Sequence, residues 1–298
     1  MKKIIFAFSL VVSIAFLSSC EEIPPYINFE PESVVEDTTY VSTEIPTPQQ
    51  RQIVIEEVTG VRCPNCPAAQ AEAKIISNNN PGRVNIITLH PLNKLNQLTS
   101  PFDENRGDKY TSKYDFRTLA GALIFEMVGI NNSLPIGNVN RMKFEGEISP
   151  NIEYQKWSAY SNVELSKPTP LNLEVTAKNI GEEVEIRVKV TYTTAVSDSN
   201  YLSVAILEND IKDVQESRDE FGSSIYDKEY KHTHVLRAMA SSFFGDLLKA
   251  EYTPGRVFIK TYRYKRGLWN PANLEVLVFV NKDVTQKEII HSTSVKVQ

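Results

Sequence analysis

The chain contains 298 residues, of which 41% are hydrophobic and 23% charged, and its formal net charge is -5. This moderately acidic balance argues against nucleic acid as a partner. The length exceeds what one typical hydrophobic core organises, so we expect two domains, and no sequence motif calls for a cofactor.

The first twenty residues have the pattern of an exported lipoprotein. Two lysines are followed by a mostly apolar run over residues 4–17, and two serines precede Cys20. The run is too short to span a bilayer comfortably. We therefore predict a signal peptide at residues 1–19 and a lipid on the Cys20 thiol, which anchors the chain to a membrane. The alternative is an ordinary signal peptide that ends beside a cysteine by chance.

Residues 20–50 are rich in Glu, Pro, Thr and Ser, so they cannot build a core by themselves. We interpret them as a lipidated tether. Tyr40 and Val41 have strand preference, which allows a short extended pairing around residues 39–43.

Residues 51–166 alternate strand-like and helix-like patterns, which is typical of a layered α/β domain. A β-branched run at 52–58 is followed by a helical segment that starts with the cysteines, and a buried strand covers 84–89. The apolar residues of the helical segment predict one stripe, formed by Ala68, Ala71 and Ile75. Farther along, the patterns predict a helix at 116–128, a short strand that ends at Val139, and a helix around 152–163.

Residues 167–298 change to a period of two, which indicates half-buried antiparallel strands. The clearest run is VEIRVKVTY, in which apolar and polar residues alternate. Together the segments predict a β-sandwich of about seven strands. These strands are expected at 171–175, 184–192, 201–208, 256–264, 274–281 and 292–297.

Cys63 and Cys66 are the two thiols left once Cys20 carries a lipid, and they form a Cys-x-x-Cys motif where a strand meets a helix. Helix N–H groups and the neighbouring Arg62 favour the thiolate of Cys63, and Cys66 is placed to resolve a mixed disulfide. Three interpretations stay open: a redox centre, a structural disulfide, and a metal site with His90.

The strand, the CPNC sequence, the helix, the next strand and the later Leu134-Pro135 resemble the thioredoxin fold. That resemblance implies that Pro135 is cis and faces the cysteine pair, and that Glu57 is a buried acid that moves a proton. Glu57 as an ordinary solvent-facing strand residue is the alternative, with Glu56 on the opposite face.

A second resemblance extends over nearly the whole chain after Cys20. The strings IEEVTGVRCPNCPAA, LPIGNVNR, YKHTHVLRAM and LEVLVFVNK are similar to those of the 28-kDa outer-membrane-protein-related lipoproteins of Bacteroidetes. That family implies a thioredoxin-like domain followed by an immunoglobulin-like β-sandwich, at the outer membrane. Glu21 and Glu22 after the lipidated cysteine resemble acidic signals for export to the cell surface.

His232 and His234 are two residues apart, so on a strand they would share one face and could chelate a metal with a carboxylate. Packing and hydrogen bonding within the sandwich is the preferred interpretation, and we expect no metal.

Two functions from different classes remain. In the first, Cys63 attacks a disulfide of an exported protein, Cys66 releases it, and Glu57 or His90 relays the proton. In the second, the disulfide braces a loop and the sandwich binds a surface ligand or assembles with a partner. Accessible, reactive cysteines would favour the first function and buried cysteines the second.

Overall fold

The computed structural model describes residues 34–92, 94–129, 133–283, 285 and 287–298. The predicted signal peptide, the predicted lipid site Cys20 and the acidic pair Glu21-Glu22 lie outside the described residues. Within the described part of the chain, no helix is both long enough and apolar enough to cross a membrane.

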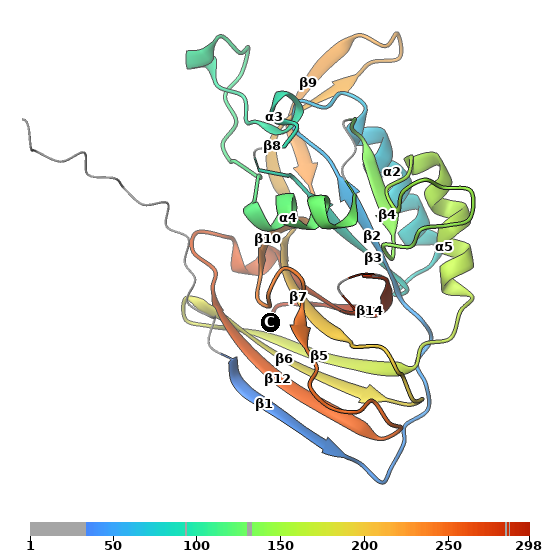
Figure 1. The fold of residues 1–298 in the computed structure, drawn as a ribbon. Helices are drawn as coiled ribbons and strands as arrows, with labels where there is room; N and C mark the ends of the chain where they lie inside the picture. The colour runs from blue at the N-terminus through green and yellow to red at the C-terminus, as the bar shows by residue number, and fades with distance from the viewer. Residues whose placement is uncertain (1–33, 93, 130–132, 284, 286) are drawn as a thin grey trace, which may run out of the picture. The chain divides into compact units, whose positions relative to one another are not determined.

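The chain has a mixed α/β architecture, with one mixed sheet that contains parallel strands and an antiparallel, sandwich-like part (Figure 1). The helical segments are α2 (Cys66–Asn79), α3 (Asn96–Thr99), η1 (Glu104–Arg106), α4 (Leu119–Val128), η2 (Tyr154–Lys156), α5 (Trp157–Leu165) and η3 (Pro271–Asn273). The strands are β1 (Val34–Val41), β2 (Ile53–Val58), β3 (Val84–Leu89), β4 (Ile136–Val139), β5 (Leu171–Ile180), β6 (Glu183–Tyr192), β7 (Tyr201–Glu208), β8 (Ile211–Arg218), β9 (Ser224–His232), β10 (Val235–Met239), β11 (Asp246–Leu247), β12 (Arg256–Lys265), β13 (Leu274–Asn281) and β14 (Ile289–Lys296).

The mixed sheet has the strand order β14-β13-β7-β10-β3-β2-β4, and β11 pairs with β7. Strand β3 runs parallel to both β2 and β10, and the other pairs are antiparallel. In this order, β3, β2 and β4 are joined to β10, β7, β13 and β14 through the pairing of Val235 in β10 with Thr88 in β3. Strands from both sides of the boundary predicted at residues 166–167 therefore lie in one sheet.

Strand β2 is buried along its whole length because both faces of the sheet are covered. Figure 1 shows α2 and α5 on one face of β2, β3 and β4, and α4 on the other. Ile53 and Ile55 pack on the α2–α5 side, whereas Val54 and Val58 pack with apolar residues of α4 and β13. Glu56 and Glu57 are consequently both buried, although they point to opposite faces.

Helix α2 buries a different stripe from the predicted one. Its buried residues are Cys66, Ala69, Ala73 and Ile76, while Ala68, Ala71 and Ile75 face solvent. Cys66 is fully buried and begins this stripe, so the inward face is rotated by about one residue from the predicted one. The alanines on the inward face let the helix approach the sheet closely.

The antiparallel part pairs β1, β12, β6 and β5 in a second sheet. Its core contains alternate residues of β6, from Val184 to Tyr192, packed with apolar residues of β7, β13 and β14. Strand β1 belongs to the predicted tether, yet it pairs with β12 from Val34 to Val41. The Gln49 side chain also bonds to the backbone of Leu173, so the chain is attached to the folded body from residue 34 onward.

Strands β8 and β9 form a hairpin whose two strands pair with each other within the described part of the chain. The sequence pattern does not predict it, because β9 is exposed along most of its length and carries few apolar residues. The hairpin packs over the loop that follows β2, and this position brings it to the cysteines.

Candidate functional site

The candidate site is the disulfide between Cys63 and Cys66, at the point where β2 leads into α2. The Cα atoms of the two cysteines are 5.4 Å apart. Between them the chain turns tightly: the Cys63 N–H donates to the Gly60 carbonyl at 3.1 Å, and the Cys66 N–H donates to the Cys63 carbonyl at 3.1 Å. Pro67 in the first helical turn suits this start, because a first-turn N–H has no helical partner to lose.

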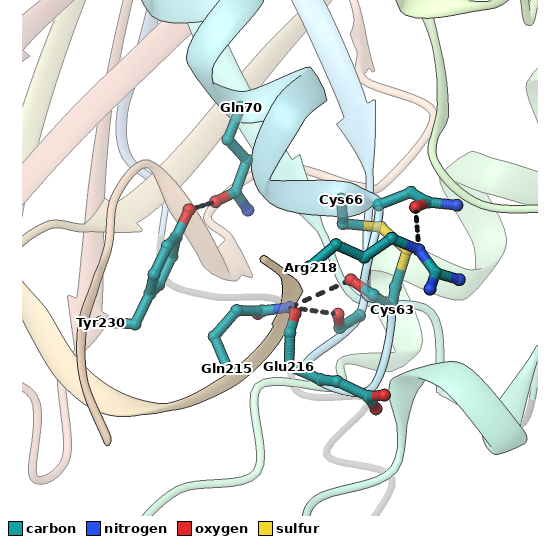
Figure 2. Close-up of a disulfide and its surroundings, with 9 residues drawn as sticks. Cys63, Cys66, Gln70, Gln215, Glu216, Arg218 and Tyr230 are labelled. Atoms are coloured by element: carbon teal, nitrogen blue, oxygen red, sulfur yellow. Dashed lines mark hydrogen bonds between the residues drawn. A yellow bond between two sulfur atoms is a disulfide. The ribbon is translucent and has the colours of Figure 1, made fainter. Parts of the chain in front are cut away.

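Both cysteines are buried, with exposed fractions of 1% for Cys63 and 0% for Cys66. Strand β8 contributes to this cover (Figure 2). The Glu216 N–H donates to the Val61 carbonyl at 2.8 Å, and the Gln215 side-chain nitrogen lies 3.3 Å from the Cys63 carbonyl oxygen. An external thiol therefore does not reach the sulfur atoms in this conformation.

Two side-chain contacts extend the cover along the hairpin. The Arg218 guanidinium donates at 2.8 Å to the side chain of Asn65, which lies between the two cysteines in the sequence. On β9, the Tyr230 hydroxyl donates to the side-chain oxygen of Gln70 on α2. Figure 2 shows the Arg218 guanidinium beside the disulfide and the contact between Tyr230 and Gln70 farther away, on the opposite side of the view.

Glu57 is buried, as the thioredoxin resemblance implies, with 1% of its surface exposed. Burial raises the pKa of its carboxyl to about 8, and a hydrogen bond from Gln70 opposes the shift. Gln70 lies one helical turn after Cys66, so the buried acid contacts the helix face that begins with the second cysteine. Burial, followed by the nearby Glu57 carboxyl, also raises the pKa of Tyr230.

Arg62 precedes Cys63, but its guanidinium points to the segment after α3. It forms an ion pair with Asp108, donates to the Ser100 carbonyl at 2.8 Å, and lies 4.4 Å from the centre of the Phe102 ring. The hydrogen bond from Arg62 lowers the pKa of Asp108 to about 2, so the two charges compensate each other. The role predicted for Arg62, to favour the Cys63 thiolate by its charge, is weakened by this pairing.

The peptide bond between Leu134 and Pro135 is cis, as the resemblance implies. Ile136 pairs with Val58 in the antiparallel register of β4 and β2. Pro135 is therefore at the end of β2 from which the loop to Cys63 begins.

His90 lies at the end of β3 and is 99% buried. Its ring contacts Phe116, with 5.3 Å between ring centres, and His232, with 6.4 Å. Burial, followed by the charges of His232 and Arg237, lowers its pKa well below the usual value. Neither ring nitrogen of His90 has a hydrogen-bond partner among the described residues. Its ring contacts therefore place His90 beside Phe116 and His232.

His232 and His234 do not share one face of a strand. Strand β9 ends at His232, whose side chain is buried, and the backbone at His234 has a φ of 53°. The His234 ring lies 3.2 Å from the Glu275 carboxylate instead. In the described part of the chain, no three His, Cys, Asp or Glu residues are grouped so that they could hold a metal ion.

The residues that sequence reasoning misses here are Gln70, Gln215, Arg218 and Tyr230. Three of them belong to the hairpin, and Gln215 is 152 residues away from Cys63 in the chain. No local motif relates such distant positions, and the polar character of β8 gives no sign that Gln215 is fully buried.

Comparison with known proteins gives two kinds of likeness. The profile of the family described as outer membrane protein Omp28 matches residues 127–298, which is more than half of the chain. Among solved structures, HBP35 of Porphyromonas gingivalis has a similar fold: the TM-score is 0.60 at 16% identity, over 83% of this chain and 76% of that chain. A protein from Agrobacterium tumefaciens matches 84% of this chain and 96% of its own at 14% identity, with a TM-score of 0.43. No curated protein matches the sequence.

Proposed function

Because this chain belongs to the Omp28 family of outer membrane proteins, we propose that it is an envelope lipoprotein whose Cys63–Cys66 pair exchanges disulfides with exported proteins. The observation that carries the proposal is the position of the disulfide, which lies between the end of a central strand and the first turn of α2. Helix N–H groups at this position stabilise a thiolate, which is the reactive form of a cysteine.

The finer description of the fold is part of this proposal. Strands β2, β3 and β4 with helix α2, the cis Pro135 and the disulfide support a thioredoxin-like module. The facing antiparallel strands support an immunoglobulin-like sandwich beside it. A thioredoxin-like scaffold hosts both exchange and binding, so the function depends on the cysteines and their surroundings.

The exchange conserves atoms and electrons. A substrate thiolate attacks the sulfur of Cys63, the bond between the two cysteines breaks, and Cys66 leaves as a thiolate. A second substrate thiolate then attacks the substrate sulfur of the mixed disulfide and releases Cys63. Two electrons and two protons pass from the substrate dithiol to the pair. The reverse steps, with a second protein disulfide as the oxidant, restore the starting state.

We assign Glu57 the role of proton carrier for Cys66. With a pKa of about 8, its carboxyl is mostly protonated near neutral pH, so it holds a proton that a leaving thiolate can take. Its hydrogen-bond partner Gln70 lies on the same helix face as Cys66, which supports this assignment. His90 fits the role less well, because its ring packs against Phe116 and His232.

The proposed anchor is a lipid on Cys20 after cleavage of residues 1–19, and it rests on the sequence pattern alone. An anchor of this kind, together with family membership, suits exported proteins as substrates. Cysteines of such substrates are the thiols that form disulfides in an oxidising compartment.

One observation favours a second function, in which the disulfide is a brace. Both cysteines are buried, and a structural disulfide is typically shielded and hard to reduce. In that case the sandwich surface would carry the binding function, and Cys63 and Cys66 would only hold the loop.

The experiment that separates the two functions is the reduction potential of the pair. The full chain with Cys20→Ser, which leaves Cys63 and Cys66 as its two thiols, is equilibrated with glutathione or dithiothreitol buffers, with Cys63→Ser as control. A potential between about -120 and -270 mV, the range of working oxidoreductases, is the expected result. A potential below roughly -300 mV would assign the disulfide to the brace and overturn disulfide exchange.

A further inference from the structure

We propose that strand β8 occupies a peptide-binding edge beside the disulfide, and that an extended segment of a partner protein binds there when the β8–β9 hairpin swings away. The exchange that follows binding rests on the proposed function, whereas the binding edge itself does not. The occupant is thus an extended polypeptide, recognised first through its backbone.

The edge consists of backbone carbonyl groups in the loop between β2 and α2. The Val61 carbonyl accepts the Glu216 N–H at 2.8 Å, which is a contact from backbone to backbone. The carbonyls of Gly60 and Cys63 lie 3.2 and 3.3 Å from the Gln215 side-chain nitrogen. Two consecutive residues of β8 therefore face all three oxygens: the Glu216 backbone bonds to Val61 as an added strand would, and the Gln215 side chain shares the Gly60 and Cys63 carbonyls with the N–H groups of the turn.

The hairpin is built as a separable element. Its strands pair with each other and with no other strand of the described chain, and β9 has an exposed outer side. The turn at its tip carries Phe221, of which 84% is exposed. A two-stranded hairpin is marginally stable by itself, so it stays closed mainly through its contacts with the body.

Those contacts are unevenly distributed. At the base, Ile211 and Val214 pack with Val61 and Phe116, and the Asp213 carboxylate accepts the N–H of Lys113 at 2.9 Å. Toward the tip, Arg218 donates to Asn65 at an exposed position, and the half-buried Tyr226 ring packs against Phe102 and Tyr110. The hairpin is therefore held by buried contacts at its base and by partly exposed contacts toward its tip.

The hydrogen bonding of the Gln215 side chain is incomplete when the hairpin is closed. Its side chain is fully buried, and its nitrogen faces three carbonyl oxygens, those of Gly60, Cys63 and Glu216. An amide group has two N–H bonds, so it cannot satisfy three acceptors fully. The Gln215 side-chain oxygen is buried and has no partner among the described residues. Opening the hairpin would return this oxygen to water, which offsets part of the contacts that are lost.

The test measures how fast the disulfide is reduced. The full chain with Cys20→Ser is treated with dithiothreitol, which gives two electrons and two protons to the pair and closes to its own cyclic disulfide. Free thiols are then counted by alkylation and gel shift. The variant Gln215→Glu places a carboxylate against three carbonyl oxygens, so it should open the hairpin and speed reduction by at least about tenfold.

Lys212→Ala is the matched control, because Lys212 lies on the exposed side of the same strand and pairs with Glu229 in solvent. It should change the rate by less than about twofold. If Gln215→Glu does not fold, as judged by circular dichroism, the double variant Arg218→Ala, Tyr230→Phe removes the side-chain hydrogen bonds from the hairpin to Asn65 and Gln70 and should also accelerate reduction. Faster hydrogen exchange at the Glu216 N–H without faster reduction would overturn the proposal.

A synthetic peptide with the sequence of residues 211–218 tests the edge itself. Added to the opened variant, it should slow reduction again, while a peptide of the same composition in scrambled order should not. No effect of the β8 peptide, in a variant whose hairpin is open, would overturn the binding edge. A brace-like potential combined with accelerated reduction would instead overturn disulfide exchange and leave the edge in place.

Discussion

The Arg141 guanidinium donates two hydrogen bonds, of 2.9 and 2.6 Å, to one carboxylate oxygen of Glu56, and both side chains are buried. The other carboxylate oxygen accepts the Asn138 side chain at 3.0 Å. The guanidinium also lies 5.0 Å from the centre of the Phe279 ring in β13. This ion pair therefore connects β2, the turn after β4, and β13, the strand whose residues pack into the cores on both faces of the mixed sheet.

We expect Glu56→Ala to lower the free energy of unfolding by about 3 to 5 kcal/mol, because it leaves the Arg141 charge buried without its partner. Urea denaturation followed by circular dichroism measures the change. Lys212→Ala serves as the control, since it removes a solvent-exposed ion pair with Glu229 and should have little effect. Equal midpoints for Glu56→Ala and the wild type would show that the buried pair does not stabilise the fold.

The Glu57 carboxyl should make the protein less stable as the pH rises. In the unfolded chain it loses its proton near pH 4.5, whereas burial in the folded chain raises its pKa to about 8. Between these two values unfolding releases a proton, so the stabilisation present below pH 4.5 is lost as the pH rises to about 8. The loss is on the order of 5 kcal/mol.

Glu57→Gln removes this titration while it keeps a side chain of similar shape. The melting temperature of the variant should therefore rise relative to the wild type as the pH increases from 4.5 to 8. Two pH profiles with a constant separation would contradict a buried, protonated Glu57.

Much of the α/β part follows from short-range patterns. The β-branched run of β2 and the apolar strand Val84–Leu89 were predictable because parallel strands buried on both faces are continuously apolar. The alternation in β6 also predicted its buried face, since each second residue points into the core. The cysteines at the strand-to-helix junction could be predicted in the same way, because the junction is local.

Long-range contacts limit what the sequence predicts about the site. Burial of Glu56 depends on Arg141, and the cover over Cys63 depends on Gln215, 152 residues farther along the chain. The hydrophobic pattern carries no information about such polar pairs. The hairpin also cannot be predicted from the hydrophobic pattern of β9, because a largely exposed strand outside the main sheets needs no apolar alternation.

Gly60→Ala should destabilise the loop that carries Cys63. A Cβ atom at this position would lie 2.2 Å from the Leu98 carbonyl oxygen, which is backbone and cannot move aside alone. We expect the free energy of unfolding to fall by about 1 to 3 kcal/mol through this clash. The comparison is Gly181→Ala, where a Cβ atom meets nothing within 4 Å and the cost is that of the positive φ of 61° alone. A smaller loss for Gly60→Ala than for Gly181→Ala would contradict the close approach.

His291 should act in the opposite direction to Glu57. Its Nδ1 accepts the Gln52 N–H at 3.2 Å, so the ring is neutral and its Nε2 donates to the Gln49 side-chain oxygen at 3.0 Å. Burial, followed by the charge of Arg51, lowers its pKa to about 4 from an unfolded value of 6.5. The stabilisation is complete above pH 6.5 and is lost as the pH falls to about 4, by on the order of 3 kcal/mol.

The measurement is again a difference between two pH profiles of thermal unfolding. His291→Gln does not titrate in this range, so the wild type should lose stability relative to the variant as the pH falls from 6.5 to 4. A proton added at Nδ1 would point at the Gln52 N–H, which cannot accept it. The segment between Gln49 and Gln52 should therefore loosen first. Faster hydrogen exchange of the Gln52 N–H at pH 4 than at pH 6.5, after correction for intrinsic rates, is the expected local sign. Unchanged protection of that N–H would contradict the prediction, because it would show that His291 is still neutral at pH 4 or that its protonation does not release the segment.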